Sequence, residues 1–95
     1  RRRSWHGNTL MATALSGFED RQRAFAGALP SVGRVSAANA YRLPEGVSRE
    51  GLVAHLAAEL ETEIMRFGPK TVAGFIFEPV VGAAGGALPA PEGYG

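Results

Sequence analysis

The sequence predicts an α/β fold in which helices cover a mostly parallel sheet, and three observations lead to this prediction. An apolar residue recurs at every fourth position between residues 49 and 67, which indicates one face of an amphipathic helix. A short turn containing glycine and proline follows. The apolar run at 72–77 then has no polar alternation, which is typical of a strand covered on both faces. A helix, a turn and a buried strand form half of a repeated α/β unit.

Composition limits what the chain can be. Its 95 residues suffice for about one small core, and ten Lys+Arg against nine Asp+Glu leave a charge of +1, so we expect neither nucleic acid nor a membrane as a partner. The absence of cysteine excludes disulfides, thiol catalysis and sulfur-ligated zinc, and no metal site is predicted. No signal peptide or spanning segment is recognised, which predicts a cytoplasmic protein. Thirteen glycines and six prolines exceed average usage, and eight of these nineteen lie within residues 79–95, so we expect a piece of a larger protein.

The first predicted element is a short helix near residues 8–16. Its apolar face is formed by Leu10, Ala14 and Leu15. Asn8 or Thr9 can cap its beginning through a side-chain oxygen, and Gly17 is expected to end it. Residues 18–47 are predicted to be mostly loop, with a helical turn or two near their start, because prolines and glycines interrupt any longer pattern.

The second predicted element is a helix over residues 49–67. Its apolar stripe consists of Leu52, Leu56, Leu60 and Ile64. Ser48 is the expected N-cap, and Gly68-Pro69 is expected to end the helix. Three glutamates lie off the stripe and are interpreted as a solvated face: Glu59, Glu61 and Glu63.

The third predicted element, the buried strand at 72–77, ends at Glu78-Pro79 because proline cannot continue a ladder. Glu78 is therefore expected at the carboxyl end of a strand, where open α/β sheets bind ligands. A carboxylate between Phe77 and Pro79 is costly to bury unless a cation, a donor or a ligand receives it. From the residues alone, a functional carboxylate and a structural salt bridge are about equally favoured.

Three further segments contain residue types that can take part in binding. Trp5-His6-Gly7 could flank a planar ligand, although a core tryptophan and a satisfied histidine are the commoner outcome. The glycine-rich stretch at 82–87 lacks the spacing of either phosphate-binding fingerprint, so a flexible loop is predicted there. Arg1–Arg3 is too short for a nucleic-acid patch and is interpreted as a solvated turn.

Three stretches together resemble one enzyme family. Ser4-Trp5-His6-Gly7-Asn8-Thr9 resembles the Ser-Tyr-His-Gly-Asn-Thr motif of class III pyridoxal-phosphate aminotransferases. Residues 68–73 leading into Phe77-Glu78-Pro79-Val80 are similar to that family's helix–strand passage. Residues 82–94 are similar to the loop that follows. The resemblance covers nearly the whole chain.

This resemblance implies both a fold and an activity. It makes residues 1–95 a partial large domain of a fold-type-I pyridoxal-phosphate enzyme, whose mostly parallel sheet is flanked by helices. The enzymes of the family use pyridoxal 5'-phosphate to move an amino group from an amine or ω-amino acid to a keto acid such as pyruvate. A homodimer is implied for the parent protein.

The resemblance also implies roles for individual residues. Trp5 stands where the family has tyrosine and would stack on the cofactor ring next to the substrate, without the phenol hydroxyl. His6 and Gly7 match motif positions near the cofactor. Glu78 matches a carboxylate close to the cofactor that pairs, in several members, with an arginine that otherwise holds the substrate carboxylate.

The resemblance also indicates what these residues lack. The Schiff-base lysine of the family lies downstream, and the one lysine present, Lys70, occupies a turn that does not match it. These 95 residues alone are therefore expected to be inactive. Two alternatives stay open: a non-catalytic α/β ligand-binding or interaction module, and another pyridoxal-phosphate chemistry, namely an aminomutase, racemase or decarboxylase.

Overall fold

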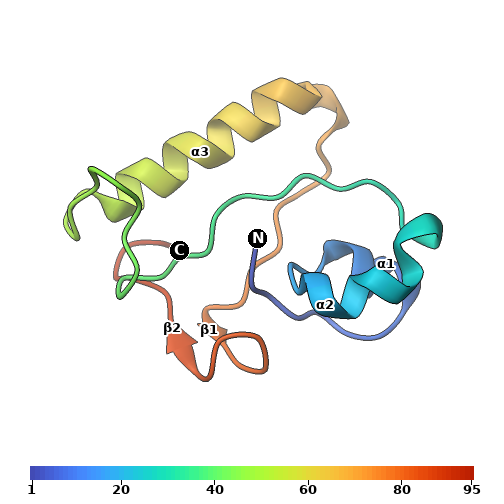
Figure 1. Cartoon of the computed structure of the whole chain (residues 1–95). Helices are drawn as coiled ribbons and strands as arrows, with labels where there is room; N and C mark the ends of the chain where they lie inside the picture. The colour runs from blue at the N-terminus through green and yellow to red at the C-terminus, as the bar shows by residue number, and fades with distance from the viewer.

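The computed structural model describes residues 1–95 and contains one long helix among shorter elements. In chain order the elements are α1 (Leu10–Leu15), α2 (Glu19–Gln22), the 3-10 helix η1 (Arg23–Ala28), α3 (Leu52–Phe67), the 3-10 helix η2 (Pro69–Thr71), β1 (Val80–Val81) and β2 (Leu88–Pro89). Figure 1 shows α3 along one side and α1 with α2 on the other, with two extended segments between them. No helix is long and apolar enough to cross a membrane.

Helix α1 confirms the first predicted helix, and Thr9 is its N-cap. The Thr9 hydroxyl accepts a hydrogen bond from the Ala12 amide at 3.2 Å, which satisfies one of the free donors at the helix start. The helix ends at Ser16 in an extended conformation. Gly17 directly follows this ending, as expected, and its φ is not positive. Glycine is required there because a Cβ would lie 2.2 Å from the carbonyl oxygen of Arg1.

Helix α3 confirms the predicted helix but begins three residues later than expected. Ser48 does not cap it: the Ser48 hydroxyl accepts from the Gly51 amide at 3.1 Å, in the turn before the helix. At the other end Gly68 adopts a positive φ of 92°, and its amide donates to the carbonyls of Ile64 and Met65. This conformation favours glycine, so the predicted ending is confirmed.

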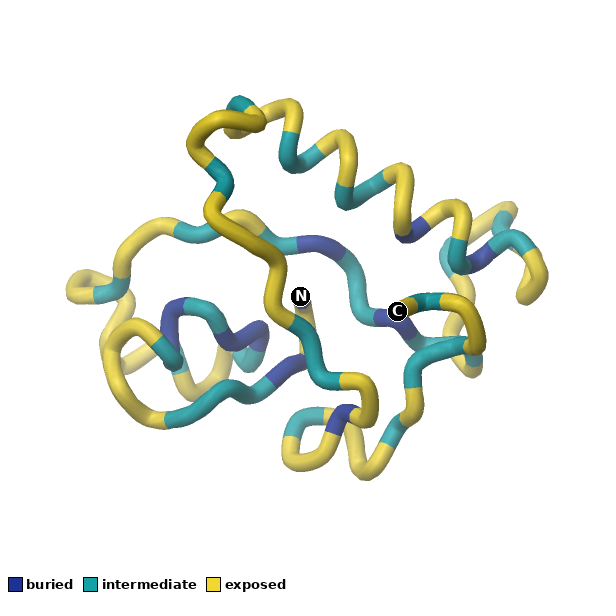
Figure 2. The backbone as a smooth tube through the Cα atoms, turned by 180° about the vertical axis from the view of Figure 1, so that it is seen from behind, coloured by how far each residue is buried: buried dark blue, intermediate teal, exposed yellow.

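The apolar stripe of α3 faces the rest of the chain. Leu52 and Leu56 are only 1% and 3% exposed, and Leu60 and Ile64 are half-buried. Leu52 and Leu56 form the main cluster with Ala38. Around it pack four partly buried residues, Ala40, Val47, Ala90 and Tyr94. Figure 2 shows how little of the chain is buried and that the outer side of α3 is exposed.

The glutamates of α3 are a solvated face only in part. Glu61 is exposed, but Glu59 accepts hydrogen bonds from both the amide and the hydroxyl of Ser36 at 3.0 Å. Glu63 binds the Arg66 guanidinium through both oxygens at 2.8 Å, and this hydrogen bonding lowers the pKa of Glu63. Glu59 therefore fastens α3 to the extended segment that contains Ser36.

The predicted buried strand at 72–77 is a single segment without a ladder partner (Figure 1). The prediction that both its faces are covered is wrong for these 95 residues, since Phe75 and Ile76 are 37% and 42% exposed. The sheet consists of β1 and β2, paired antiparallel with Val80 opposite Pro89. The glycine-rich residues between them form the predicted loop. A parallel strand needs neighbours from distant parts of a sequence, and none occurs within this chain.

Candidate functional site

The carboxylate of Glu78 joins three parts of the chain. One oxygen accepts a hydrogen bond from the Trp5 amide at 2.7 Å, and the other accepts from the Gly82 amide at 3.1 Å. The main-chain oxygen of Glu78 accepts from the Arg1 guanidinium at 2.7 Å. Glu78 therefore receives donors, as its position predicted, but from the main chain rather than from a side-chain salt bridge. It brings the Trp5 segment to the end of the 72–78 segment.

The Trp5 side chain is half-buried and already has a cation on its ring. The guanidinium carbon of Arg21, from α2, lies 4.9 Å from the Trp5 ring centroid, and it also lies 5.6 Å from the ring of Phe18. A guanidinium stacks on one face of an aromatic ring. Any planar ligand that stacks on Trp5 must therefore use the opposite face or displace Arg21.

His6 contains an unsatisfied polar atom. Its main-chain amide donates to the Ser16 hydroxyl at 2.9 Å, but its ring Nε2 is buried and has no hydrogen-bond partner. Burial lowers the pKa of His6, and the Arg1 guanidinium lowers it further, while the Glu78 carboxylate opposes this shift. The ring is therefore neutral at pH 7, and its Nε2 can receive or donate one hydrogen bond.

Gly7 gives the motif its shape. Its φ is 125°, a conformation that side chains rarely tolerate, and a Cβ would lie 3.3 Å from the Cβ of Ala12 in α1. Glycine at this position lets the segment turn from His6 into the cap of α1.

Two serines that sequence reasoning assigned no role hold this segment in place. Ser4 is fully buried, donates to the Arg1 carbonyl at 2.6 Å and accepts from the Gly17 amide at 3.0 Å. Ser16 is also fully buried; it donates to the Ala12 carbonyl at 2.7 Å while accepting from His6. Nothing local marks a serine as buried, because serine is usually a surface residue. Their bonds explain how a polar segment is positioned without apolar anchors.

The interpretation of Arg1–Arg3 as a solvated turn is wrong for Arg1. Arg1 is 3% exposed, whereas Arg2 and Arg3 are exposed. The Arg1 guanidinium carbon lies 5.4 Å from the ring centroid of Tyr94 and 6.0 Å from that of Phe77. A short basic run on an otherwise neutral chain gives no signal that one of its members is internal.

The site residues predicted from sequence therefore lie together. Trp5, His6 and Gly7 form one continuous segment, and Glu78 meets that segment from the other end of the sequence. Lys70 is exposed on η2 and makes no contact with this cluster among the observed hydrogen bonds and ion pairs. The cluster combines an aromatic face, one unpartnered ring nitrogen and a carboxylate held by amides. These features fit a planar, polar cofactor bound at this cluster.

Comparisons with known proteins match the chain over nearly its whole length, although no protein-family model matches it. An aminotransferase of Gibberella zeae is 45% identical over 94 residues, which cover 96% of this chain and 18% of that protein. An uncharacterized aminotransferase of Bacillus subtilis is 43% identical over 91 residues, covering 96% of this chain and 20% of that protein. Over almost its whole length the chain is similar to a segment of aminotransferases.

Solved structures agree with this assignment. The omega transaminase of Pseudomonas jessenii in complex with PMP has a TM-score of 0.88 and 38% identity, covering 99% of this chain and 21% of that one. The chain therefore has the arrangement of the stretch that it matches in transaminases, and the predicted resemblance to aminotransferases is confirmed. The chain spans about a fifth of the length of the relatives it matches.

Proposed function

We propose that the whole protein is a class III aminotransferase that uses pyridoxal 5'-phosphate to transfer an amino group from an amine or ω-amino acid to a keto acid such as pyruvate. One observation carries the proposal: the Glu78 carboxylate accepts a hydrogen bond from the amide of Trp5, so the motif residue and this carboxylate form one site. Gamma-aminobutyrate transaminase 1 of rice, 40% identical over 96 residues, supports the choice of donor class.

Each residue of this cluster would contribute to binding the cofactor. Trp5 would cover one face of the pyridine ring, and the neutral His6 would offer its free Nε2 to a cofactor or substrate oxygen. Gly7 has no side chain, so it would let the main chain of this segment lie close to the cofactor. When bound, the cofactor supplies an electron sink for cleavage of bonds at the amine carbon, and the protein supplies orientation and electrostatics.

Glu78 would contribute in a different way from a simple ligand. Both of its carboxylate oxygens accept from main-chain amides, so it fixes the segment that carries the aromatic ring. If Glu78 also pairs with an arginine that binds the substrate carboxylate, the remaining lone pairs of its two oxygens would receive that arginine beside the amides. The two half-reactions then suffer unequally in Glu78→Gln, since only the partner with the relevant carboxylate needs that arginine free. If stopped-flow absorbance shows equal, small effects of Glu78→Gln on both half-reactions, the role of Glu78 is only structural.

Further properties are proposed for the whole protein. We infer a homodimer with a fold-type-I large domain, of which residues 1–95 form part, and a cytoplasmic location. Light scattering and cell fractionation test the dimer and the compartment. The names of some relatives include the words mitochondrial or chloroplastic. Localisation to an organelle would therefore contradict the proposed cytoplasmic location.

The activity is tested on the full-length protein supplied with pyridoxal phosphate, an ω-amino acid and pyruvate. Equimolar alanine and oxidised donor are expected. Isomerised donor without alanine would indicate an aminomutase or racemase, carbon dioxide release would indicate a decarboxylase, and no cofactor binding would indicate a non-catalytic module. After borohydride reduction, peptide mapping should find the cofactor label on a lysine outside these residues, and a stoichiometric label on Lys70 would contradict the assignment.

Trp5 variants test the cofactor site itself. Trp5→Ala removes a ring-on-ring contact worth about 0.5–1.5 kcal/mol beyond the buried area, so the cofactor should dissociate several-fold more readily. Trp5→Tyr, which restores the family's motif residue, should retain the cofactor nearly as well as the wild type. Retention is measured by cofactor absorbance after gel filtration. Equal retention by Trp5→Ala would show that the ring does not stack.

A further inference from the structure

The guanidinium of Arg21 lies between two aromatic rings of neighbouring segments. Its carbon is 4.9 Å from the ring centroid of Trp5, which is within the range of a cation–π contact, and 5.6 Å from that of Phe18. Arg21 belongs to α2, and Phe18 is the residue just before this helix. Arg21 therefore joins the aromatic residue of the motif to the beginning of α2, through contacts that lie wholly within the described chain.

The two acidic residues beside Arg21 in α2 bind other arginines. A Glu19 oxygen lies 3.5 Å from the Arg2 guanidinium, and an Asp20 oxygen lies 3.0 Å from that of Arg23. The charge of Arg21 is therefore directed at the rings and not at a carboxylate of its own helix. Tryptophan attracts a cation more strongly than tyrosine or phenylalanine does. Tryptophan at position 5, where the related motif has tyrosine, therefore strengthens this contact.

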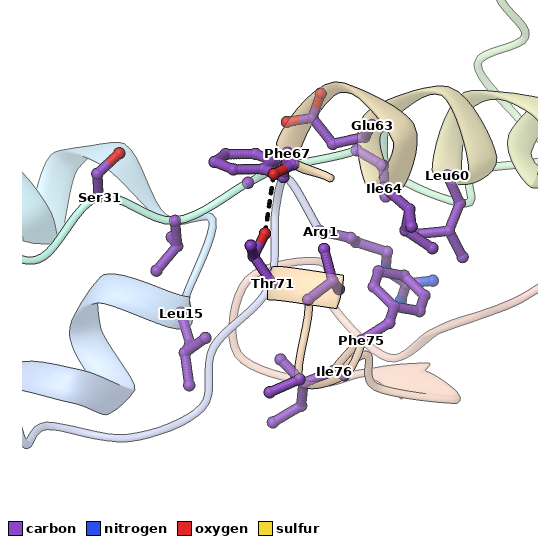
Figure 3. A pocket seen from close by; sticks show the side chains of 16 residues that line it. Arg1, Leu15, Ser31, Leu60, Glu63, Ile64, Phe67, Thr71, Phe75 and Ile76 are labelled. Carbon is purple, nitrogen blue, oxygen red and sulfur yellow. Dashed lines mark hydrogen bonds between the residues drawn. The ribbon is translucent and has the colours of Figure 1, made fainter. Parts of the chain in front are cut away.

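A planar ligand that stacks on Trp5 lies outside the apolar groove of the molecule. This groove of about 280 Å³ lies between the second half of α3 and the 72–76 segment, and Phe75 and Ile76 are part of its lining (Figure 3). Neither Trp5 nor Glu78 lines it. Stacking on Trp5 therefore takes place elsewhere, and the ring face opposite the guanidinium is the one left for it.

We propose that Arg21 is a positioning residue of the cofactor site, which holds the Trp5 ring from one face and leaves the opposite face to the pyridine ring of the cofactor. This role rests on the proposed function, because it requires a cofactor that stacks on Trp5. Arg21 acts only through the ring, so it can strengthen cofactor binding by no more than its preference for the binding-competent orientation of Trp5. For a partly exposed cation–π contact this limit is about two- to fivefold.

A double-mutant cycle on the full-length protein tests this role. Arg21→Met removes the guanidinium and keeps an apolar side chain, so the dissociation constant for pyridoxal phosphate, measured by absorbance in equilibrium dialysis, should rise about two- to fivefold. In the Trp5→Ala background the same change should have no effect, because the ring through which Arg21 acts is absent. If Trp5→Ala does not fold, Trp5→Leu replaces it in the cycle. Equal losses in both backgrounds would overturn the proposal.

Two further variants separate positioning of the ring from general damage to α2. Arg23→Met removes a neighbouring exposed arginine, which binds Asp20, and it should leave the dissociation constant unchanged. Arg21→Lys keeps the charge but loses the planar group that stacks, so its dissociation constant should lie between those of the wild type and Arg21→Met. A loss in Arg23→Met as large as that in Arg21→Met, or equal binding by Arg21→Lys and Arg21→Met, would contradict the proposal.

The visible circular dichroism of the bound cofactor adds a measurement that a loss of stability alone does not change. Because this signal depends on how the bound ring is oriented in its asymmetric surroundings, its amplitude per bound cofactor should change in Arg21→Met and stay the same in Arg23→Met. If the wild type binds no pyridoxal phosphate, the proposed function and the positioning role both fail. If it binds the cofactor but the cycle shows no coupling between Arg21 and Trp5, only the positioning role fails.

Discussion

Replacing Glu78 by glutamine is the sharpest test of how the candidate site is held. The carboxylate accepts from two main-chain amides, and glutamine offers one oxygen and one NH₂ group. The remaining oxygen should face the Trp5 amide, because that bond is the shorter at 2.7 Å and lies in a partly buried place. The NH₂ group then faces the Gly82 amide, and two donors oppose one another.

The size of the effect follows from which amide loses its acceptor. A hydrogen bond to a charged group contributes about 1.5–3 kcal/mol, and a buried donor left unsatisfied costs about 1–3 kcal/mol. Gly82 is exposed, so water can replace part of the lost bond. We therefore expect Glu78→Gln to destabilise the glycine-rich loop by about 1 kcal/mol, whereas Glu78→Ala should release both amides and cost more.

Hydrogen exchange measured by mass spectrometry on the full-length protein separates the two amides. In Glu78→Gln, peptides containing Gly82 should exchange several-fold faster, while peptides containing Trp5 should keep their protection. In Glu78→Ala both should lose protection. Glu92→Gln, which alters an exposed carboxylate with no hydrogen bond in the structure, is the matched control and should change neither. Unchanged exchange at Gly82 in Glu78→Gln, or equal loss at both sites, would refute the reasoning.

Three further predictions address packing, close approach and pH. Leu56→Asp should abolish cooperative unfolding of the full-length protein in a thermal melt, because Leu56 is 3% exposed, whereas Ala54→Asp on the exposed side of α3 should unfold near the wild-type temperature. Gly17→Ala should be severely destabilising in urea titration because its Cβ would lie 2.2 Å from a main-chain oxygen, while Gly27→Ala, with nothing within 4 Å, should be near neutral. Because burial lowers the pKa of His6, the unfolded chain takes up this proton first as the pH falls. The free energy of unfolding should therefore decrease below about pH 6.5, and it should decrease less in His6→Asn. Chemical denaturation at several pH values measures this, and identical pH profiles of the wild type and His6→Asn would contradict a role of His6.

Local patterns were sufficient to predict the helices α1 and α3, but not the strands β1 and β2. The four-residue stripe predicted α3, Thr9 was one of two expected caps of α1, and Gly68 ends α3 as expected. Ser48 shows the limit of such reasoning, because its hydroxyl accepts a hydrogen bond from the amide of Gly51, the residue just before α3 begins. Capping depends on where the first helical turn begins, and a sequence pattern fixes that boundary only to within a few residues.

The candidate site was predictable as a set of residues but not as a set of bonds. Its members came from a motif and from a carboxylate at a strand end, and the structure brings Trp5 and Glu78 together. The partners of Glu78 were not predictable, because two main-chain amides leave no signature in side-chain identity. Ser4 and Ser16 were missed for the same reason, since their hydroxyls bind main-chain groups.

The exposed segment at 72–77 and the buried Arg1 differ from the sequence-based expectation in opposite directions. The sequence of the segment is that of a strand covered on both faces, yet Phe75 and Ile76 are partly exposed and no ladder partner is present. Arg1 has the opposite mismatch: a charged residue at 3% exposure without an acid to receive two of its nitrogens. Apolar side chains without cover and a buried cation without an anion are both unfavourable. Both mismatches lie at one groove, because Arg1, Phe75 and Ile76 all line it. Side-chain chemistry alone predicts an exposed arginine and a buried apolar run, whereas actual burial depends on which distant segments pack against each of them.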